Sequence, residues 1–254
     1  MTSSPEVALQ VEGLHVIFND ASGVVHALRD LNFSINRNDF VCLIGPSGSG
    51  KSTLLRVLAG LVQPTRGCCT FISKHPGVGL VFQKANLMPW RRVLENVALP
   101  LELQRIPPEA IQRRAMELIK LVGLEGFEHA YPRDLSGGMA QRVAIARSLM
   151  QDPDLLLLDE PFGSLDALTR ERMGDELLHI WQARRKTVLM VTHSISEAIY
   201  LSDRVLVLSP RPGRIDLQLE VHLPRPRTPE MRYSSEFSTL AQRLRDSLRE
   251  DEIG

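Results

Sequence analysis

Residues 45–52 carry the pattern whose residue types and spacing are most specific for chemistry. They read Gly45-Pro-Ser-Gly-Ser-Gly50-Lys51-Ser52 and match G-x-x-x-x-G-K-[ST] at every fixed position. Glycines let the backbone curl so that several N–H groups face phosphate oxygens, and the positive end of a following helix strengthens this field. Lys51 would reach the β- and γ-phosphates, and the Ser52 hydroxyl would bind Mg²⁺. The alternative, a glycine turn before an ordinary helix, is disfavoured by the complete match.

Two acidic residues follow a second apolar run. Leu155–Leu158 reads as a buried strand, and Asp159 and Glu160 come directly after it. An aspartate at that position can hold Mg²⁺, directly or through water, and the glutamate can orient and deprotonate an attacking water. A pair of solvated carboxylates is the alternative, and the phosphate-binding pattern upstream argues against it.

Two further polar residues end predicted strands. Gln83 follows the strand that we expect over 78–82, and a glutamine there can reach Mg²⁺ or the attacking water. His193 follows the strand over 187–191, where it would face the γ-phosphate. A polar strand end explains Gln83 equally well, and His193 taken alone would more often be an ordinary loop histidine.

Residues 135–139, Leu-Ser-Gly-Gly-Met, open a predicted helix. Ser136 is a candidate N-cap, and two glycines at a helix start form a second anion site. One chain therefore carries two helix starts suited to phosphate. This is unusual for a self-contained enzyme but is expected if the second site serves the nucleotide of another subunit.

Two aromatic segments leave their role open. Phe18 ends the first predicted strand and could stack on an adenine ring, but a core phenylalanine is the simpler interpretation. Residues 86–90, Asn-Leu-Met-Pro-Trp, form either an apolar surface for a partner or part of the core.

The elements that must position these residues alternate between strands and helices. Apolar periodicity predicts strands over 7–18, 24–28, 31–35, 40–44, 68–72, 78–82, 155–158, 187–191, 205–208 and 215–219. It predicts helices after the phosphate loop, over 93–103 and 110–121, from about 135, over 167–183 and over 196–201. Residues 222–254 form a proline-rich and then charged amphipathic tail, which is too short for a separate regulatory domain.

Composition limits the class of protein. Thirty basic and thirty acidic side chains cancel, which argues against a nucleic-acid partner. We expect no signal peptide and no membrane helix, because the termini are polar and no apolar run approaches about 18 residues. The three cysteines, Cys42, Cys68 and Cys69, have no zinc spacing and suit a reducing compartment. A redox role for the Cys68-Cys69 pair stays an alternative.

Taken in order, these motifs resemble the nucleotide-binding subunit of an ABC (ATP-binding cassette) transporter over about residues 7–220. The similarity covers Gly45–Thr53 as Walker A, Gln83 as the Q-loop and Leu135–Met139 as the signature motif. It continues with Leu155–Glu160 as Walker B, Ser164–Asp166 as the D-loop and His193 as the H-loop. The signature motif between the two Walker motifs makes the resemblance specific.

The resemblance implies an ATP hydrolase with ATP and Mg²⁺ as cofactors. The implied catalytic residues are Glu160 as general base, His193 at the γ-phosphate and Gln83, and the implied metal ligands are Ser52, Gln83 and Asp159. The implied nucleotide-binding residues are Phe18, Gly45, Pro46, Ser47, Gly48, Ser49, Gly50, Lys51, Ser52, Thr53, Ser136, Gly137, Gly138 and Asp166. Ser136 and Gly138 would contact the nucleotide of a second subunit, and Asp166 would belong to the interface that links the two sites.

The resemblance also implies a fold and an assembly. The fold would be an α/β P-loop NTPase cassette with a mainly parallel core sheet, an antiparallel β subdomain and a helical insertion at about 84–150. Residues 1–220 would form the ATPase domain and 221–254 a short tail with a charged helix. Two cassettes, most simply two copies of this chain, would sandwich two ATP molecules head to tail. They would act peripherally on the cytoplasmic face of the membrane, on separate permease subunits and indirectly with an extracytoplasmic solute-binding protein.

Four segments narrow the class further. Asp159–Ala167 resembles the ATPases of importers in general. Asn86–Trp90, Leu135–Met139 and His193–Ala198 are similar to ATPases that import nitrate, sulfonates and taurine. That group includes importers of pyrimidine precursors, which stay an alternative. A soluble ABC protein acting on DNA or ribosomes, and a switch that binds nucleotide without hydrolysis, are further alternatives. The charge balance argues against the protein that acts on DNA or ribosomes. The presence of Glu160 and His193 argues against the switch without hydrolysis.

The chain departs from the family pattern at three places. Asn38-Asp39 replaces the usual Gly-Glu, and asparagine tolerates a left-handed turn there. Met139 replaces the commoner glutamine. The stretch 67–79 is shorter than usual, which leaves the local strand pairing open.

Overall fold

The computed structural model describes residues 6–20, 23–73, 77–104 and 106–250. The chain divides into two compact units. Unit 1 combines residues 1–76 with 186–254, and unit 2 is the continuous segment 77–185. Each unit is described by itself.

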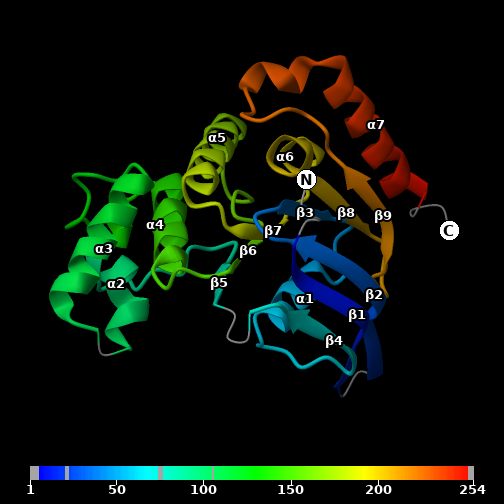
Figure 1. The fold of residues 1–254 in the computed structure, drawn as a ribbon, viewed down its shortest axis with the longest axis horizontal. Helices are drawn as coiled ribbons and strands as arrows, with labels where there is room; N and C mark the ends of the chain where they lie inside the picture. Colours follow the sequence, from blue (N-terminus) through cyan, green and yellow to red (C-terminus); the bar gives the residue numbers. More distant parts are fainter. Residues whose placement is uncertain (1–5, 21–22, 74–76, 105, 251–254) are drawn as a thin grey trace. The chain divides into compact units, whose positions relative to one another are not determined.

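A mainly parallel sheet forms the core of unit 1 (Figure 1). β3 (Phe40–Ile44) pairs in parallel with β7 (Thr187–Val191) on one side and with β8 (Arg204–Leu208) on the other. β9 (Ile215–Glu220) adds an antiparallel edge to β8. Every residue of β3 and β7 is buried, as their uninterrupted apolar runs predict. α1 (Lys51–Leu58) follows β3, and α6 (Ile195–Leu201) packs against β3 and β8.

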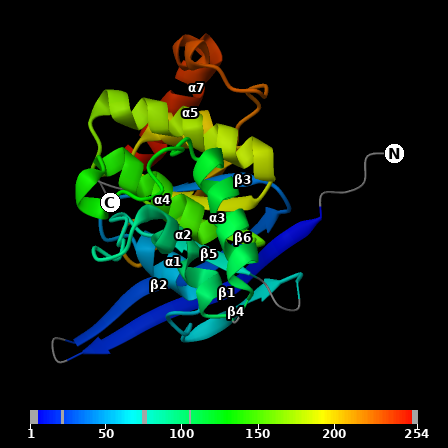
Figure 2. The same cartoon turned by 90° about the vertical axis from the view of Figure 1, so that its left-hand side faces the viewer.

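A second, antiparallel sheet in unit 1 has the order β2-β1-β4. β1 (Val7–Asp20) and β2 (Gly23–Asn36) form a long ribbon, and β4 (Arg66–Phe71) pairs with β1 (Figure 2). The prediction of two separate strands over 24–28 and 31–35 is wrong. Asp30 takes a left-handed φ of 52°, and the register with β1 shifts nearby, so the predicted break is an irregularity inside one strand.

The turn before β3 confirms the expectation for Asn38. Asn38 has a φ of 63°, a conformation that asparagine tolerates better than most residues. Its backbone N–H donates to Thr187 Oγ1 over 3.1 Å, which ties the turn to the start of β7. The Asp39 carboxylate accepts a hydrogen bond from the backbone N–H of Asn36 over 3.3 Å. The departure from Gly-Glu is therefore accommodated locally.

The tail packs onto unit 1. A 3₁₀ helix, η2 (Pro229–Tyr233), precedes α7 (Ser235–Glu250), and α7 packs against η2, α6 and β8. Phe237, Leu240, Ala241 and Leu244 are buried, which confirms the amphipathic pattern. Arg225 and Arg227 anchor the strap before η2, because their guanidinium groups donate to the carbonyls of Leu201 and Ser202.

Unit 2 joins a strand pair to helices. β5 (Val78–Val81) and β6 (Leu155–Asp159) pair in parallel. The helices are α2 (Val93–Glu102), α3 (Pro108–Leu121), α4 (Gly137–Leu149) and α5 (Ala167–Arg184), with a 3₁₀ turn, η1 (Pro132–Asp134), before α4. α2, α3 and α4 pack against one another. The predicted helices are confirmed within three residues at each end.

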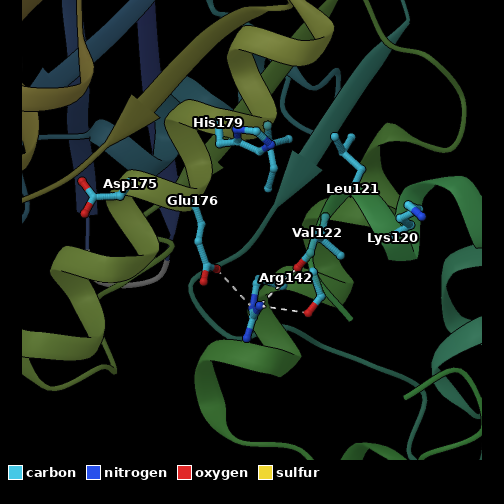
Figure 3. Close-up of a pocket in the computed structure, with 9 residues that line it drawn as sticks. Lys120, Leu121, Val122, Arg142, Asp175, Glu176 and His179 are labelled. Carbon is cyan, nitrogen blue, oxygen red and sulfur yellow. Dashed lines mark hydrogen bonds and ion pairs between the residues drawn. The ribbon is translucent and has the colours of Figure 1, made fainter. Parts of the chain in front are cut away.

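Arg142 of α4 links three of these helices. Its guanidinium donates to the carbonyls of Val122 and Gly123, at the end of α3, over 3.2 and 3.3 Å. Its Nε lies 3.3 Å from Glu176 Oε2 of α5 (Figure 3). The same side chains line a hollow of about 430 Å³ between the three helices. Arg142 therefore caps α3 and fixes α5 against α4.

Asn96 is a second internal hub of unit 2, and the sequence pattern did not single it out. The side chain is fully buried in α2. Its Oδ1 accepts from the backbone N–H of Met88 over 2.8 Å, and its Nδ2 donates to the carbonyls of Met88, Arg91 and Arg92. One amide side chain thus holds the segment before α2 through four hydrogen bonds.

Trp90 lies in this segment, and its side chain is 72% exposed. The prediction of an apolar surface there is therefore favoured over core packing.

We predict that Asn96→Ala destabilises unit 2 by about 3 kcal/mol, because several buried backbone groups lose their partner at once. Thermal unfolding followed by circular dichroism measures the loss. Gln112→Ala, at an exposed position of α3, is the matched control and should leave the transition unchanged. Equal transitions in the two variants would show that water replaces the amide without cost.

The adjacent cysteines of β4 differ in environment. Cys68 is exposed, whereas Cys69 is partly buried, and both thiols are free. Burial, with a smaller effect of Cys68, raises the pKa of Cys69 from 9.0 to about 11. Neighbouring side chains of a strand point to opposite faces, so the pair does not present two thiols to one ligand. This disfavours a joint redox role.

We predict that Cys69 reacts with iodoacetamide about 100-fold more slowly in the folded protein than in the urea-unfolded protein at pH 8, because the thiolate is the reactive form. The difference should shrink as the pH rises toward the raised pKa. Fragment-ion mass spectrometry distinguishes Cys69 from Cys68. Equal rates in the folded and unfolded protein would contradict the burial of this thiol.

Candidate nucleotide site

The phosphate loop of unit 1 lies between β3 and α1, as predicted. Gly48 and Gly50 have φ values of 80° and 100°, which side chains with a Cβ rarely adopt. A Cβ on Gly50 would lie 2.8 Å from the carbonyl oxygen of Ala27, and one on Gly45 would lie 2.7 Å from that of Leu208. Glycine is therefore needed at both ends of the loop for steric reasons in addition to any ligand.

Lys51 fills the inside of this loop. The side chain is only 5% exposed although it carries a charge. Its Nζ donates to the carbonyl oxygens of Gly45 and Pro46 over 2.9 and 2.8 Å, and Ser49 Oγ lies at 3.4 Å. The loop thus holds one ammonium group by its own backbone, next to the start of α1. Such a group stabilises an anion placed against the loop.

His193 lies at the same sheet edge as the phosphate loop. Leu43 of β3 is opposite Val191 of β7, and the backbone N–H of Thr192 donates to the carbonyl of Leu43 over 3.2 Å. The chain continues from Thr192 into His193, whose side chain is exposed. Thr192 Oγ1 hydrogen-bonds the carboxylate of Glu197 and accepts from the backbone N–H of Ser194, which fixes this short connection.

Phe18 is not a core residue. It lies on β1 opposite Val25, and its side chain is 42% exposed. The simpler reading of Phe18, a phenylalanine in the core, is therefore wrong. An exposed ring remains available for stacking.

In unit 2 the structure brings Gln83 and Glu160 together. Val81 of β5 is opposite Leu158 of β6, so the residues after both strands share one edge. Gln83 Nε2 lies 3.4 Å from Glu160 Oε2. Glu160 has a φ of 47°, a sparsely populated conformation for a residue with a side chain, and such strain is common at functional sites. Asp159, one residue earlier, is partly buried at the end of β6.

The helix start at 136–138 has the expected cap. Ser136 Oγ accepts a hydrogen bond from the backbone N–H of Met139 over 3.2 Å, and α4 begins at Gly137. Ser136 and Gly137 are exposed, so this helix start is accessible to a ligand. Asp166 caps α5 in the same way, because its Oδ1 accepts from Thr169 N over 3.0 Å. Hydrogen bonds from Thr169 lower the pKa of the Asp166 carboxyl.

Two residues of α4 escaped the sequence reasoning. Gln141 is buried and donates to the carbonyl of Phe82 over 3.1 Å. Arg147 donates to the carbonyls of Asn86 and Ala85 over 2.9 and 2.8 Å. Both hold the segment around Gln83 from the helix that Ser136 caps. Two long polar side chains among the apolar residues of α4 were the available signal.

The predicted residues therefore fall into two groups. Unit 1 holds Phe18, residues 45–53 and His193, and unit 2 holds Gln83, Ser136, Gly137, Gly138, Asp159, Glu160 and Asp166. Among the described residues, no cluster of three His, Cys, Asp or Glu side chains could hold a metal by itself. The Ser52 hydroxyl, the Asp159 carboxylate and the Gln83 amide are oxygen donors, which suit Mg²⁺. In the part of the chain that the structure describes, no helix is long and apolar enough to cross a membrane.

Comparison with known proteins decides the family. The family model described as ABC transporter matches residues 28–163. The chain belongs to the ABC transporter family. ABC cassettes hydrolyse ATP, so the expected activity of this cassette, an ATPase, is confirmed, as is its fold class.

The relatives cover most of the ABC cassette. An uncharacterised ABC transporter ATP-binding protein of Methanocaldococcus jannaschii is 50% identical over 251 residues, 97% of this chain and 93% of its own. The nitrate import ATP-binding protein of Synechocystis is 47% identical over 221 residues, 85% of this chain and 83% of its own. The taurine import ATP-binding protein of Rhizobium johnstonii is 48% identical over 213 residues, 82% and 81% of the two chains. An aliphatic sulfonates import ATP-binding protein of Bacillus cereus matches at 43% over 229 residues, 87% of this chain and 89% of its own.

A solved structure supports the same assignment. A dimeric ATP-binding cassette in a post-hydrolysis state, bound to ADP and Pi, is 32% identical to this chain. The TM-score is 0.73, and the match covers 85% of this chain and all of that cassette. The relatives named above confirm the resemblance to ATPases that import nitrate, sulfonates and taurine.

We predict that Ser136→Ala destabilises unit 2 by about 1 kcal/mol, the usual effect of removing an N-cap. Ser136→Asp retains a capping oxygen and should restore the thermal transition. Ser164→Ala, at an exposed loop position, is the matched control. If Ser136→Ala unfolds like the wild type, the hydroxyl contributes nothing to α4.

Proposed function

We propose that this ABC cassette is the ATP-hydrolysing motor of an importer that takes up nitrate, a sulfonate, taurine or a similar solute. The observation that carries the proposal is the place of Glu160, which lies at the end of β6 in a strained conformation beside Gln83. A carboxylate there can align and deprotonate a water. The import class is supported by relatives named for nitrate, taurine and sulfonates, ahead of the pyrimidine-precursor and soluble alternatives.

In unit 1 the phosphate loop binds the nucleotide. Residues 45–53 present backbone N–H groups and the Ser52 and Thr53 hydroxyls to the phosphates, and Lys51 neutralises the β- and γ-phosphate charge. The exposed ring of Phe18 stacks on the adenine. His193 donates to the γ-phosphate from its fixed connection after β7. Catalysis is thus mainly positioning and charge stabilisation.

In unit 2 Glu160 acts as the general base, and Gln83 orients both the water and the base. Ser52, Gln83 and Asp159 would hold Mg²⁺, which when bound neutralises the charge that develops on the phosphoryl oxygens. Glu160 receives one proton of the attacking water as the water oxygen bonds to the γ-phosphorus, while the bond from this phosphorus to its bridging oxygen breaks and ADP leaves with the electron pair. The left-handed backbone at Glu160 limits the directions in which this carboxylate can point, which favours one alignment.

The second anion site serves another cassette. Ser136, Gly137 and Gly138 bind the γ-phosphate of a nucleotide held by a second copy of the chain, and Asp166 contributes to the interface between the copies. ATP binding closes this dimer and hydrolysis reopens it. The exposed segment around Trp90 transmits the movement to permease subunits at the cytoplasmic face of the membrane. A solute-binding protein outside the membrane delivers the solute to the permease.

We predict that Glu160→Gln lowers kcat for ATP hydrolysis by at least about 100-fold while ATP binding persists, because only the base is lost. The variant should then accumulate an ATP-bound dimer, which light scattering detects. Glu171→Gln, at an exposed position of α5, is the matched control and should retain full activity.

Different outcomes address different parts of the proposal. Full hydrolysis by Glu160→Gln would exclude this residue as the base. A Glu160→Gln variant that binds ATP but stays a monomer would exclude the head-to-tail dimer. Reconstitution with the partner permease, followed by uptake assays with nitrate, taurine and an alkanesulfonate, tests the solute class. Uptake of a pyrimidine precursor alone would overturn that class and leave the motor intact.

A further inference from the structure

A turn outside every recognised motif lies against the phosphate loop. Residues 209–214 connect β8 to β9 within unit 1. Ser209 closes this turn, because its backbone N–H donates to the carbonyl of Arg214 over 3.0 Å and its Oγ accepts from the backbone N–H of Arg214 over 2.9 Å. Ser209 Oγ also donates to the carbonyl of Pro210 over 2.9 Å. The turn is therefore a fixed structure.

Gly213 docks this turn onto β2 and the loop. Its backbone N–H donates to the carbonyl of Ala27 over 3.0 Å, and its carbonyl accepts from Arg29 over 2.9 Å. A Cβ on Gly213 would lie 2.1 Å from the carbonyl oxygen of Ser49. The turn and the phosphate loop thus touch backbone to backbone, and any side chain at 213 would separate them.

The side chain of Arg211 extends from this turn to Gly48 in the middle of the phosphate loop. Its Nε donates to the carbonyl oxygen of Gly48 over 3.1 Å. One of its terminal nitrogens lies 3.5 Å from the place that a Cβ on Gly48 would occupy. Gly48 has a φ of 80°, so its peptide could turn in more than one direction without this contact. A guanidinium outside the motif therefore holds a glycine peptide of the loop.

We propose that Arg211 is a positioning residue of the nucleotide site, which holds the Gly48 carbonyl away from the phosphates and so aligns the loop before ATP arrives. The inference rests on the proposed function of the loop. A carbonyl oxygen turned toward a phosphate would repel it, whereas N–H groups turned inward attract it. Fixing the peptide in advance removes an ordering cost from binding. The ligand whose binding depends on Arg211 is thus a polyphosphate.

The test is steady-state ATP hydrolysis by the purified full chain, with wild type, Arg211→Met, Arg211→Lys and Arg214→Met. Arg211→Met keeps the length of the stem and loses the donor, and Arg211→Lys restores a donor and the charge. Arg214 lies beside the same turn and is exposed, and its hydrogen bond to Ser209 comes from the backbone. Arg214→Met therefore removes the same charge without touching Gly48.

We predict that Arg211→Met raises KM for ATP about 3- to 10-fold, the effect of losing one hydrogen bond that acts in both ground state and transition state, and changes kcat less than about twofold. Arg211→Lys should restore most of the affinity, and Arg214→Met should resemble the wild type. The effect should persist at about 0.5 M salt, which screens long-range attraction. Thermal transitions that match the wild type would separate positioning from loss of fold.

Each other result overturns the inference. An unchanged KM in Arg211→Met shows that the loop keeps its shape without the contact. Equal effects of Arg211→Met and Arg214→Met, or an effect that vanishes at high salt, show general attraction by charge. A KM effect that follows a lowered thermal transition shows a structural role. Wild type that does not hydrolyse ATP would contradict the proposed function itself, and this series detects that outcome separately.

Discussion

The nucleotide-binding half of this cassette depends on close contact between three pieces of backbone. The carbonyl oxygens of Leu208 and Ala27 lie so near Gly45 and Gly50 that no Cβ would fit at either position, and Gly213 meets the carbonyl of Ser49 in the same way. Dense contact of this kind leaves little room for alternative loop shapes. β2 of the antiparallel sheet and the turn after β8 therefore restrict the conformation of the phosphate loop. The antiparallel sheet thus helps to shape the phosphate loop.

Unit 2 uses side chains for the same purpose. The segment between β5 and α2 has no regular structure over most of its length, and its carbonyls accept from Gln141, Arg147 and Asn96. These donors come from two helices, α4 and α2. The position of Gln83 is thus linked to the helix whose first turn carries Ser136. A shift of α4 would move the carbonyls on either side of Gln83, because Gln141 and Arg147 bond to them. A ligand at the start of α4 could therefore affect the position of Gln83 beside Glu160.

Sequence reasoning was most successful where one local rule decides the outcome. Buried strands such as β3 and β7, the cap at Ser136 and the turn at Asn38 follow from periodicity, hydrogen-bonding capacity and backbone preference, which are local. It failed at Phe18, because exposure depends on what other segments leave uncovered. It also failed at β2, since the turn-like residues near Asp30 form an irregularity once β1 supplies a partner. Arg211 and Asn96 were missed because their partners are carbonyl groups, which carry no sequence signature.

The place of β3 in the chain has a consequence for biosynthesis. Phe40 on this strand pairs with Val188, and Val41 pairs with Arg204, so both neighbours of β3 are made after the whole of unit 2. At ordinary rates of translation this delay lasts roughly 10–30 s. During that time a strand of five apolar residues lacks both of its sheet neighbours, while unit 2 is being made. The newly made chain thus carries this apolar segment without its sheet partners until β7 and β8 have been made.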